Sequence, residues 1–155
     1  MNWKERATRL GEIETSLQEL EEEAGRLRSE ELEDLRKGGR GIRAWLGYGF
    51  ESSCGLTEEF ALFARAYKKH IANLLGNGFS LMAWSRGHFE VSGFIENEQT
   101  GRLAYFSCPD VRAWPDEWYN NILVRTAKNE KDYTGGPNNY CTLDTFLEAV
   151  TRLTG

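Results

Sequence analysis

The first 37 residues carry a repeating pattern of apolar positions that predicts one long helix. From Asn2 to Lys37 the chain has no proline and is built mainly of Glu, Leu, Arg and Ala, which favour helix. Its apolar positions alternate in steps of three and four residues, as in the a/d seam of a coiled coil. The seam consists of Leu10, Ile13, Leu17, Leu20, Ala24 and Leu27. Gly38 and Gly39 then predict the end of the helix.

Two arrangements suit such a helix: packing on its own domain, or pairing with a second helix. A narrow seam flanked by charge is typical of a contact between two helices, whereas packing on a domain usually needs a broader apolar face. Leu32 and Leu35 leave the seam and would serve the alternative, a helix packed on its own domain. Gly11 and Gly25 weaken an isolated helix by about 1 kcal/mol each relative to alanine. We therefore expect a homodimer formed through the seam.

Residues 38–155 switch between helical and strand periodicity, which predicts an α+β body. Residues 38–41 form a candidate hinge, and the apolar run over 42–50 contains too many glycines for a regular central strand. A helix is expected from Thr57, its N-cap, to the glycines at 76–78. Its apolar face would consist of Phe60, Ala64, Tyr67, Ile71 and Leu74.

Alternating residues then predict antiparallel strands over 79–85, 88–96, 102–108 and 121–127. In the first, Met82 and Trp84 are expected on one face, opposite Leu81 and Ala83. A final helix capped by Thr142 would bury Phe146, Val150 and Leu153. The expected fold is thus a heptad helix over residues 1–37, followed by an α+β domain over 38–155 in which two helices pack on about four strands.

Charge divides the chain in the same way. The net charge is −5, and residues 1–37 carry seven Lys or Arg against eleven Asp or Glu. Most of the acidity therefore lies on the helix. The isoelectric point of the chain, about 5.2, argues against a general nucleic-acid-coating role but leaves room for a local basic site. Aromatic residues make up 12% of the chain, which excludes a disordered protein.

The sequence also predicts where the protein resides. No window approaches the ~18 apolar residues of a membrane span, and the N-terminus lacks the apolar run of a signal peptide. The odd number of widely spaced cysteines suits reduced thiols. We therefore expect a cytoplasmic protein that does not associate with membranes.

The stretch from Arg125 to Tyr140 is the first candidate for binding. It follows an apolar strand and combines cations, tyrosines, glycines and asparagines. Such a loop would meet phosphates or carboxylates and would stack on a base or a partner. The alternative is a solvated loop of tight turns whose acidic residues neutralise most of the charge. The candidate contact residues are Arg125, Lys128, Lys131, Tyr133, Asn138 and Asn139.

The connector from Asp110 to Tyr119 is the second candidate. Trp and Arg are frequent anchors of protein interfaces, which points to Arg112, Trp114 and Trp118. The competing explanation is that the two tryptophans, four residues apart, cover one end of the core.

Catalytic and metal signals are weak. A cysteine nucleophile would need Cys54 or Cys108 beside His88 and Asp110, and nothing in the sequence brings them together. His70, His88 and the cysteines lack the spacing of a metal site. We expect neither an enzyme, nor a metal, nor a cofactor, and a cysteine enzyme stands third among the functional hypotheses.

The segment Tyr119-Asn-Asn-Ile-Leu-Val-Arg-Thr-Ala-Lys-Asn-Glu-Lys-Asp-Tyr-Thr-Gly-Gly-Pro-Asn-Asn-Tyr140 resembles small proteins carried by phages and conjugative elements. This resemblance covers the C-terminal half and excludes the heptad helix. In general style the chain is similar to anti-CRISPR and other anti-defence inhibitors, which implies a non-enzymatic protein that occupies the nucleic-acid-binding surface of its target. The alternative is a nucleic-acid-binding accessory protein of a mobile element that uses the Arg125–Tyr140 loop.

Overall fold

A computed structural model describes residues 1–37, 41–47 and 57–155. The chain divides into two compact units, residues 1–40 and residues 41–155. Residues 38–40 of the candidate hinge, residues 48–50 at the end of the apolar run, and Cys54 lie outside the described residues, as does the side chain of Thr57.

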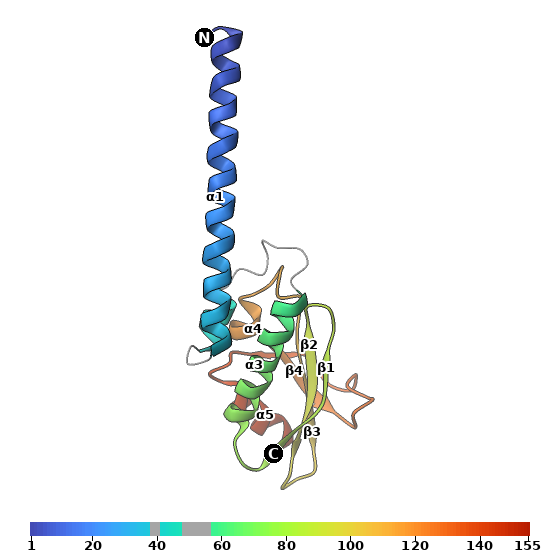
Figure 1. Cartoon of the computed structure of the whole chain (residues 1–155). Helices are drawn as coiled ribbons and strands as arrows, with labels where there is room; N and C mark the ends of the chain where they lie inside the picture. The colour runs from blue at the N-terminus through green and yellow to red at the C-terminus, as the bar shows by residue number, and fades with distance from the viewer. Residues whose placement is uncertain (38–40, 48–56) are drawn as a thin grey trace. The chain divides into compact units, whose positions relative to one another are not determined.

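The first unit is helix α1 (Trp3–Lys37), which confirms the long N-terminal helix (Figure 1). It begins with a reciprocal cap: Glu5 N–H donates to Asn2 Oδ1, and Asn2 N–H donates to the Glu5 carboxylate, both at 2.9 Å. This capping box satisfies two backbone donors that the helix itself leaves unpaired. The larger seam side chains are 40–60% exposed along α1: Leu10, Ile13, Leu17, Leu20 and Leu27.

The second unit is an α+β domain, as the periodicity predicts. Its helices are α2 (Ile42–Leu46), α3 (Thr57–Leu75), α4 (Glu117–Asn120) and α5 (Phe146–Thr154). Its strands are β1 (Phe79–Arg86), β2 (Val91–Asn97), β3 (Leu103–Cys108), β4 (Ile122–Ala127) and β5 (Asn139–Cys141). The expectation of about four strands misses β5, and it also misses the short helices α2 and α4, because segments of three to five residues complete no clear period.

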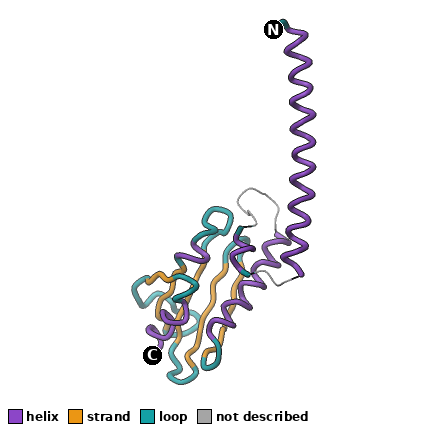
Figure 2. Tube along the Cα trace, turned by 90° about the vertical axis from the view of Figure 1, so that its left-hand side faces the viewer, coloured by secondary structure: helices purple, strands orange, loops and turns teal. Residues whose placement is uncertain are grey.

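The five strands form one antiparallel sheet in the order β1-β2-β3-β4-β5 (Figures 1 and 2). Consecutive strands are neighbours. Short turns join β1 to β2 and β2 to β3, whereas the longer segments 109–121 and 128–138 join β3 to β4 and β4 to β5. Gly76 (φ +63°) ends α3, and Gly101 (φ +72°) completes the turn between β2 and β3. Both adopt the left-handed conformation that favours glycine.

Helices α3 and α5 pack on the same face of the sheet, which we call the inner face. From α3, Tyr67 meets the Cys108 thiol at 3.4 Å. From α5, Phe146 contacts Phe106 edge to face, with ring centroids 5.6 Å apart. Because Phe106 and Cys108 are two residues apart on β3, they point to one face.

The buried face of α3 differs slightly from the predicted one. Phe60, Ala64, Tyr67 and Ile71 are buried as expected, but Phe63 and Leu75 join them and Leu74 is only half-buried. On α5, Phe146 and Val150 are buried and Leu153 is half-buried, so Ala149 and Thr154 complete the inner face there. That helix begins at Phe146, because Thr142 and Thr145 first form a turn in which each side chain accepts the other's backbone N–H.

A bulge in β1 overturns the predicted alternation of that strand. Met82 pairs with Phe94, but the next ladder pair is Ser85 with Ser92, and Ala83 between them has φ +48°. The shift brings Trp84 to the inner face, where it lies 6.1 Å from Phe106 between ring centroids. Met82 and Trp84 therefore do not share a face, because a bulged residue breaks the two-residue period.

None of the described helices combines the length and apolarity that crossing a bilayer requires.

Candidate functional site

The outer face of the sheet carries polar and aromatic side chains. Ser92 of β2, Tyr105 and Ser107 of β3 and Leu123 of β4 are half-buried on this face. Within residues 41–155, helices α3 and α5 pack on the opposite, inner face of the sheet. The loop after β4 partly covers the far end, where Tyr133 stacks on Tyr105 with ring centroids 4.3 Å apart.

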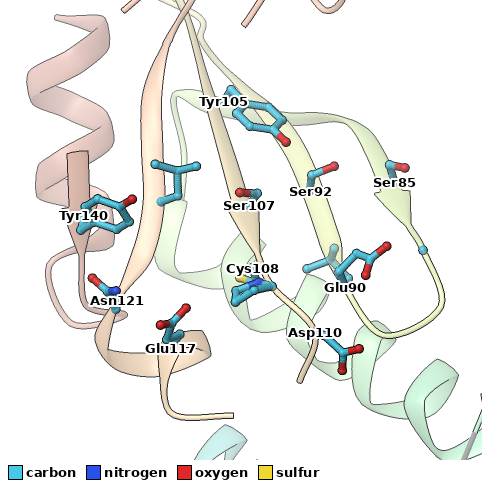
Figure 3. A pocket seen from close by; sticks show the side chains of 14 residues that line it. Ser85, Glu90, Ser92, Tyr105, Ser107, Cys108, Asp110, Glu117, Asn121 and Tyr140 are labelled. Atoms are coloured by element: carbon cyan, nitrogen blue, oxygen red, sulfur yellow. The ribbon is translucent and has the colours of Figure 1, made fainter. Parts of the chain in front are cut away.

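A pocket of about 620 Å³ opens on this outer face (Figure 3). Its floor is formed by Tyr105 and Ser107 of β3, Ser92 of β2 and Leu123 of β4. Its edges come from the β1–β2 connection, the segment after β3, α4 and β5. The polar side chains at these edges are Ser85, Glu90, Asp110, Glu117, Asn121 and Tyr140. The volume lies within the usual ~300–1,000 Å³ of protein ligand sites.

Three carboxylates reach the pocket from three different segments. Glu90 precedes β2, Asp110 follows β3, and Glu117 opens α4 (Figure 3). A hydrogen bond from Val111 N–H to Phe89 O, at 2.9 Å, ties the segment of Asp110 to that of Glu90. Backbone pairing thus brings together acids that lie 20 residues apart in the chain.

Arg112 partly neutralises this acidic edge. Its Nε and Nη2 donate to the two Asp110 oxygens at 3.1 and 2.7 Å, and its guanidinium lies 3.8 Å from the centre of the Phe89 ring. The hydrogen bonds from Arg112 lower the pKa of Asp110, so this carboxylate stays ionised. Glu90 and Glu117 have no ion-pair partner among the described residues, which leaves the edge net negative.

The third acid, Glu117, is positioned by the core beneath it. The next residue, Trp118, is fully buried against Phe60, Phe63 and Tyr67. Its indole N–H donates to Pro109 O at 2.7 Å, and the Tyr67 hydroxyl donates to Trp118 O at 2.7 Å. Helix α4 is therefore anchored at its centre, and Glu117 is held at the edge of the pocket.

This burial corrects the expectation that Trp118 is an interface anchor. The side chain is inaccessible and belongs to the core, as the competing explanation for the two tryptophans requires. The explanation holds for only one of them, because Trp114 is 57% exposed. Arg112 is half-buried and committed to Asp110 and Phe89, so it shapes the pocket edge.

The predicted binding loop folds into a compact structure. Lys128 N–H donates to Asp132 O and Asp132 N–H donates to Asn129 O, which closes a tight turn. The guanidinium of Arg125 donates to Gly136 O at 2.9 Å and so holds the returning chain. The loop therefore contains the tight turns of the solvated-loop interpretation, and Arg125 acts inside it as a structural residue.

The other predicted loop residues lie at the surface. Lys128, Lys131 and Asn138 are exposed, while Asn139 starts β5 and donates to Pro137 O at 3.1 Å. Tyr133 is 40% exposed, with one ring face used against Tyr105. This loop and the connector with Trp114 lie at opposite ends of β4, so the structure does not join them into one patch. The pocket lies between them, with Tyr105 at one end and Asp110 at the other.

From the sequence, Cys108 and Asp110 were candidates for catalysis, Glu117 lay within the candidate connector, and Tyr140 ended the candidate loop. The other lining residues were not predicted. One signal was present: Ser92 on β2, and Tyr105 and Ser107 on β3, recur every second residue opposite buried apolar ones. Polar residues at that period indicate a sheet face without a helix over it. The acids at the edges carry no such signal, because they come from connections between elements.

Thiol chemistry receives little support from the described cysteines. Cys108 is buried, and burial raises the pKa of its thiol to about 12. Burial also raises the pKa of Cys141 to about 11. A protonated thiol is a poor nucleophile, so neither suits cysteine catalysis at neutral pH. His88 is exposed, whereas the buried Cys108 thiol donates to the Tyr67 hydroxyl. Among the described residues no group of three His, Cys, Asp or Glu side chains could hold a metal ion.

Comparison with known proteins adds no further constraint. No family model, curated protein or solved structure matches this sequence.

Proposed function

We propose that this chain is a protein-binding protein that holds a basic segment of a partner in the outer-face pocket. The observation that carries the proposal is that Glu90, Asp110 and Glu117 all line one pocket, on the face of the sheet opposite α3 and α5. Carboxylates bind guanidinium and ammonium groups through charge-assisted hydrogen bonds. The serine hydroxyls on the floor and the Asn121 side chain provide further acceptors for the same donors.

Exposed aromatic side chains near the pocket support a protein partner. Trp114 and Tyr140 are each 57% exposed, and Tyr133 is 40% exposed. Tyrosine and tryptophan are enriched among the residues that contribute most to binding energy at protein interfaces. An acidic pocket with aromatic surroundings therefore suits a peptide segment that combines cations with apolar side chains.

A partner of this chemistry fits the inhibitory role that the resemblance implies. Surfaces that bind nucleic acid are rich in Lys and Arg. A protein that captures such a segment would occupy the surface in place of nucleic acid, as an anti-defence inhibitor from a mobile element does. We place this protein in the cytoplasm, as a homodimer formed through α1, without catalytic activity.

Direct nucleic-acid binding remains the competing proposal. Its candidate residues are less available than their sequence suggests, because Arg125 donates to Gly136 O and Tyr133 stacks on Tyr105. Lys128 and Lys131 are exposed, but Glu130 and Asp132 share the same turn. The neighbouring acidic pocket would repel phosphates. These observations favour the protein partner.

The test is a titration of the full chain with labelled peptides of equal length that are rich in arginine, neutral or acidic. We expect only the arginine-rich peptide to bind, and we expect its affinity to fall as the salt concentration rises. Glu90→Gln combined with Glu117→Gln should weaken it about tenfold, since each change removes a charged acceptor. Glu148→Gln, an exposed carboxylate on α5, is the matched control and should leave the affinity unchanged.

Equal binding of all three peptides, or no binding, would contradict the proposal. Labelled single- and double-stranded oligonucleotides are titrated in parallel. Oligonucleotide binding that is lost in Lys128→Ala combined with Lys131→Ala would establish the competing function instead.

A further inference from the structure

We infer that α1 pairs with a second copy of itself in parallel, in register, so that both α+β bodies lie at the same end of the dimer. This inference rests on the homodimer in the proposed function and adds its direction and its consequence. The arrangement of charge along the two borders of the apolar seam favours this direction.

The exposed seam assigns every residue of α1 a place in the heptad. Leu10, Leu17 and Ala24 occupy a positions, and Ile13, Leu20 and Leu27 occupy d positions. The flanking g and e positions then follow by counting. The charged residues among them are Arg9, Glu23 and Glu30 at g, and Glu14, Glu21 and Arg28 at e. Gly11 and Gly25 fall at b, where an added Cβ meets nothing within 4 Å, so neither lies in the seam.

In a parallel pair, each g residue faces the e residue five positions later on the other helix. Arg9 then faces Glu14 of the second copy, and Glu23 faces Arg28 of the second copy. The two-fold symmetry makes each of these pairs occur twice. The remaining border pair, Ser16 with Glu21, joins an uncharged residue to a charged one, so it is neither an ion pair nor a like-charge pair. The parallel register therefore contains attractive charge pairs and no like-charge pair.

An antiparallel pair in full overlap has a different set of neighbours. Aligning Leu10 with Leu27 of the second copy brings g residues against g residues and e residues against e residues. Arg9 then faces Glu30, which is attractive, but Glu14 faces Glu21, which is repulsive and also occurs twice. Charge along the borders thus favours the parallel direction.

The ion pairs of Arg9 and Arg26 within α1 do not oppose this assignment. Arg9 meets Glu12 at 3.2 Å, and Arg26 meets Glu23 at 3.9 Å and Glu30 at 3.1 Å, with all five side chains more than half exposed. Pairs in this setting are weak and exchange readily with alternatives.

The direction in which the two copies of α1 pair sets how far apart the two α+β bodies lie. The chain leaves α1 at Lys37 and enters the body at Gly41, so a parallel pair delivers two bodies to one end. An antiparallel pair would separate the two exits by roughly 50 Å, the length of a helix of this size. A parallel dimer therefore holds two outer-face pockets at one end, and if both engage one target, binding at the first raises the effective concentration for the second.

The experiment compares charge-reversal variants of the full chain by sedimentation equilibrium without any peptide ligand. Arg9→Glu places a glutamate opposite Glu14 of the other copy, at both symmetry-related places in the dimer. It should therefore raise the dimer dissociation constant about tenfold. Adding Glu14→Arg should restore dimerisation to within about threefold of the original. Lys4→Glu, the same change of charge at an outward b position, is the matched control and should change it by less than about twofold.

Mixing two variant chains gives a second test that does not depend on absolute stability. The Arg9→Glu chain and the Glu14→Arg chain each repel their own copies in the parallel register but attract one another. Native mass spectrometry should therefore show the mixed dimer in excess over either homodimer.

Three outcomes would overturn the inference. A monomeric original chain at micromolar concentration would contradict the pairing itself. If Glu30→Arg restores the dimerisation of the Arg9→Glu chain and Glu14→Arg does not, the helices pair in the antiparallel direction. A statistical mixture of dimers would show that border charges do not select the register. None of these results depends on whether the outer-face pocket binds a basic segment.

Discussion

Tyr133, in the loop after β4, stacks on Tyr105 of β3 with ring centroids 4.3 Å apart and ring planes inclined by 18°. Phe94 of β2 completes the cluster, at 5.2 Å from Tyr105 and 6.3 Å from Tyr133. The contact folds a polar loop onto the sheet and closes one end of the outer-face pocket.

Removing this stack should release the loop. Tyr133→Ala should lower the free energy of unfolding by about 1 kcal/mol, the worth of an aromatic pair, and should speed amide hydrogen exchange over residues 128–138. Tyr133→Phe keeps the ring and serves as the control. Unchanged exchange in Tyr133→Ala would show that Arg125 and the tight turn hold the loop without the stack.

Replacing each of the two tryptophans of the connector by alanine should change the stability by very different amounts. Trp118→Ala removes a fully buried ring and should cost about 3–5 kcal/mol of stability. Trp114→Ala alters an exposed side chain and should stay within about 0.5 kcal/mol. Urea denaturation, or the melting temperature where Trp118→Ala is too unstable, measures both. Similar losses for the two variants would contradict the assignment of only Trp118 to the core.

Close packing between β2 and β3 should make Gly93 intolerant of a side chain. A Cβ at this position would lie 2.8 Å from the ring of Phe106, which is fully buried and cannot withdraw easily. Gly93→Ala should therefore destabilise the body by about 1–3 kcal/mol in thermal or urea unfolding. Gly135→Ala is the matched control, because its Cβ would meet only Lys128 at an ordinary 3.6 Å.

Stability should decline in alkaline solution. In the folded protein the pKa of Cys108 is raised from 9.0 to about 12 and that of Cys141 from 9.0 to about 11. The unfolded chain therefore loses thiol protons first, so it binds fewer protons and the free energy of unfolding falls as pH rises from 9 towards 12. At pH 8 both thiols are protonated in either state and contribute no such loss.

The measurement is urea unfolding at several pH values between 8 and 11. Cys108→Ala should flatten the decline between pH 9 and 11, whatever its effect on stability at pH 8. Part of the decline should persist in that variant, because burial also raises the pKa of Tyr67. An equally steep decline in Cys108→Ala would assign the effect to other groups.

Elements with long, regular periods could be predicted from the sequence, whereas irregular ones could not. The steps of three and four residues in α1, and the alternation in β2, β3 and β4, repeat often enough to define helix and strand. The bulge at Ala83 left no mark in the pattern, so Trp84 was expected on the wrong face. Its position depends on how β1 pairs with β2, which is a property of two strands together.

For the candidate site, the sequence was a weaker guide still, because residue type alone does not reveal which side chains are exposed. Tyr133 and Trp114 stood out as aromatic residues in polar connections, but the same argument selected Trp118, which the core buries. Residue type does not reveal which side of a short helix faces inward, because α4 is only four residues long.

The long helix, its charge, the α+β class and most strand positions could be predicted from periodicity and composition along single segments. That Glu90, Asp110 and Glu117 line one pocket, and that the Arg125–Tyr140 loop folds onto the sheet, follows from tertiary contacts alone. The physical reason is that these contacts join segments through backbone pairing and buried packing. Such contacts depend on where each connection runs in space, which no local pattern of apolar and polar residues specifies.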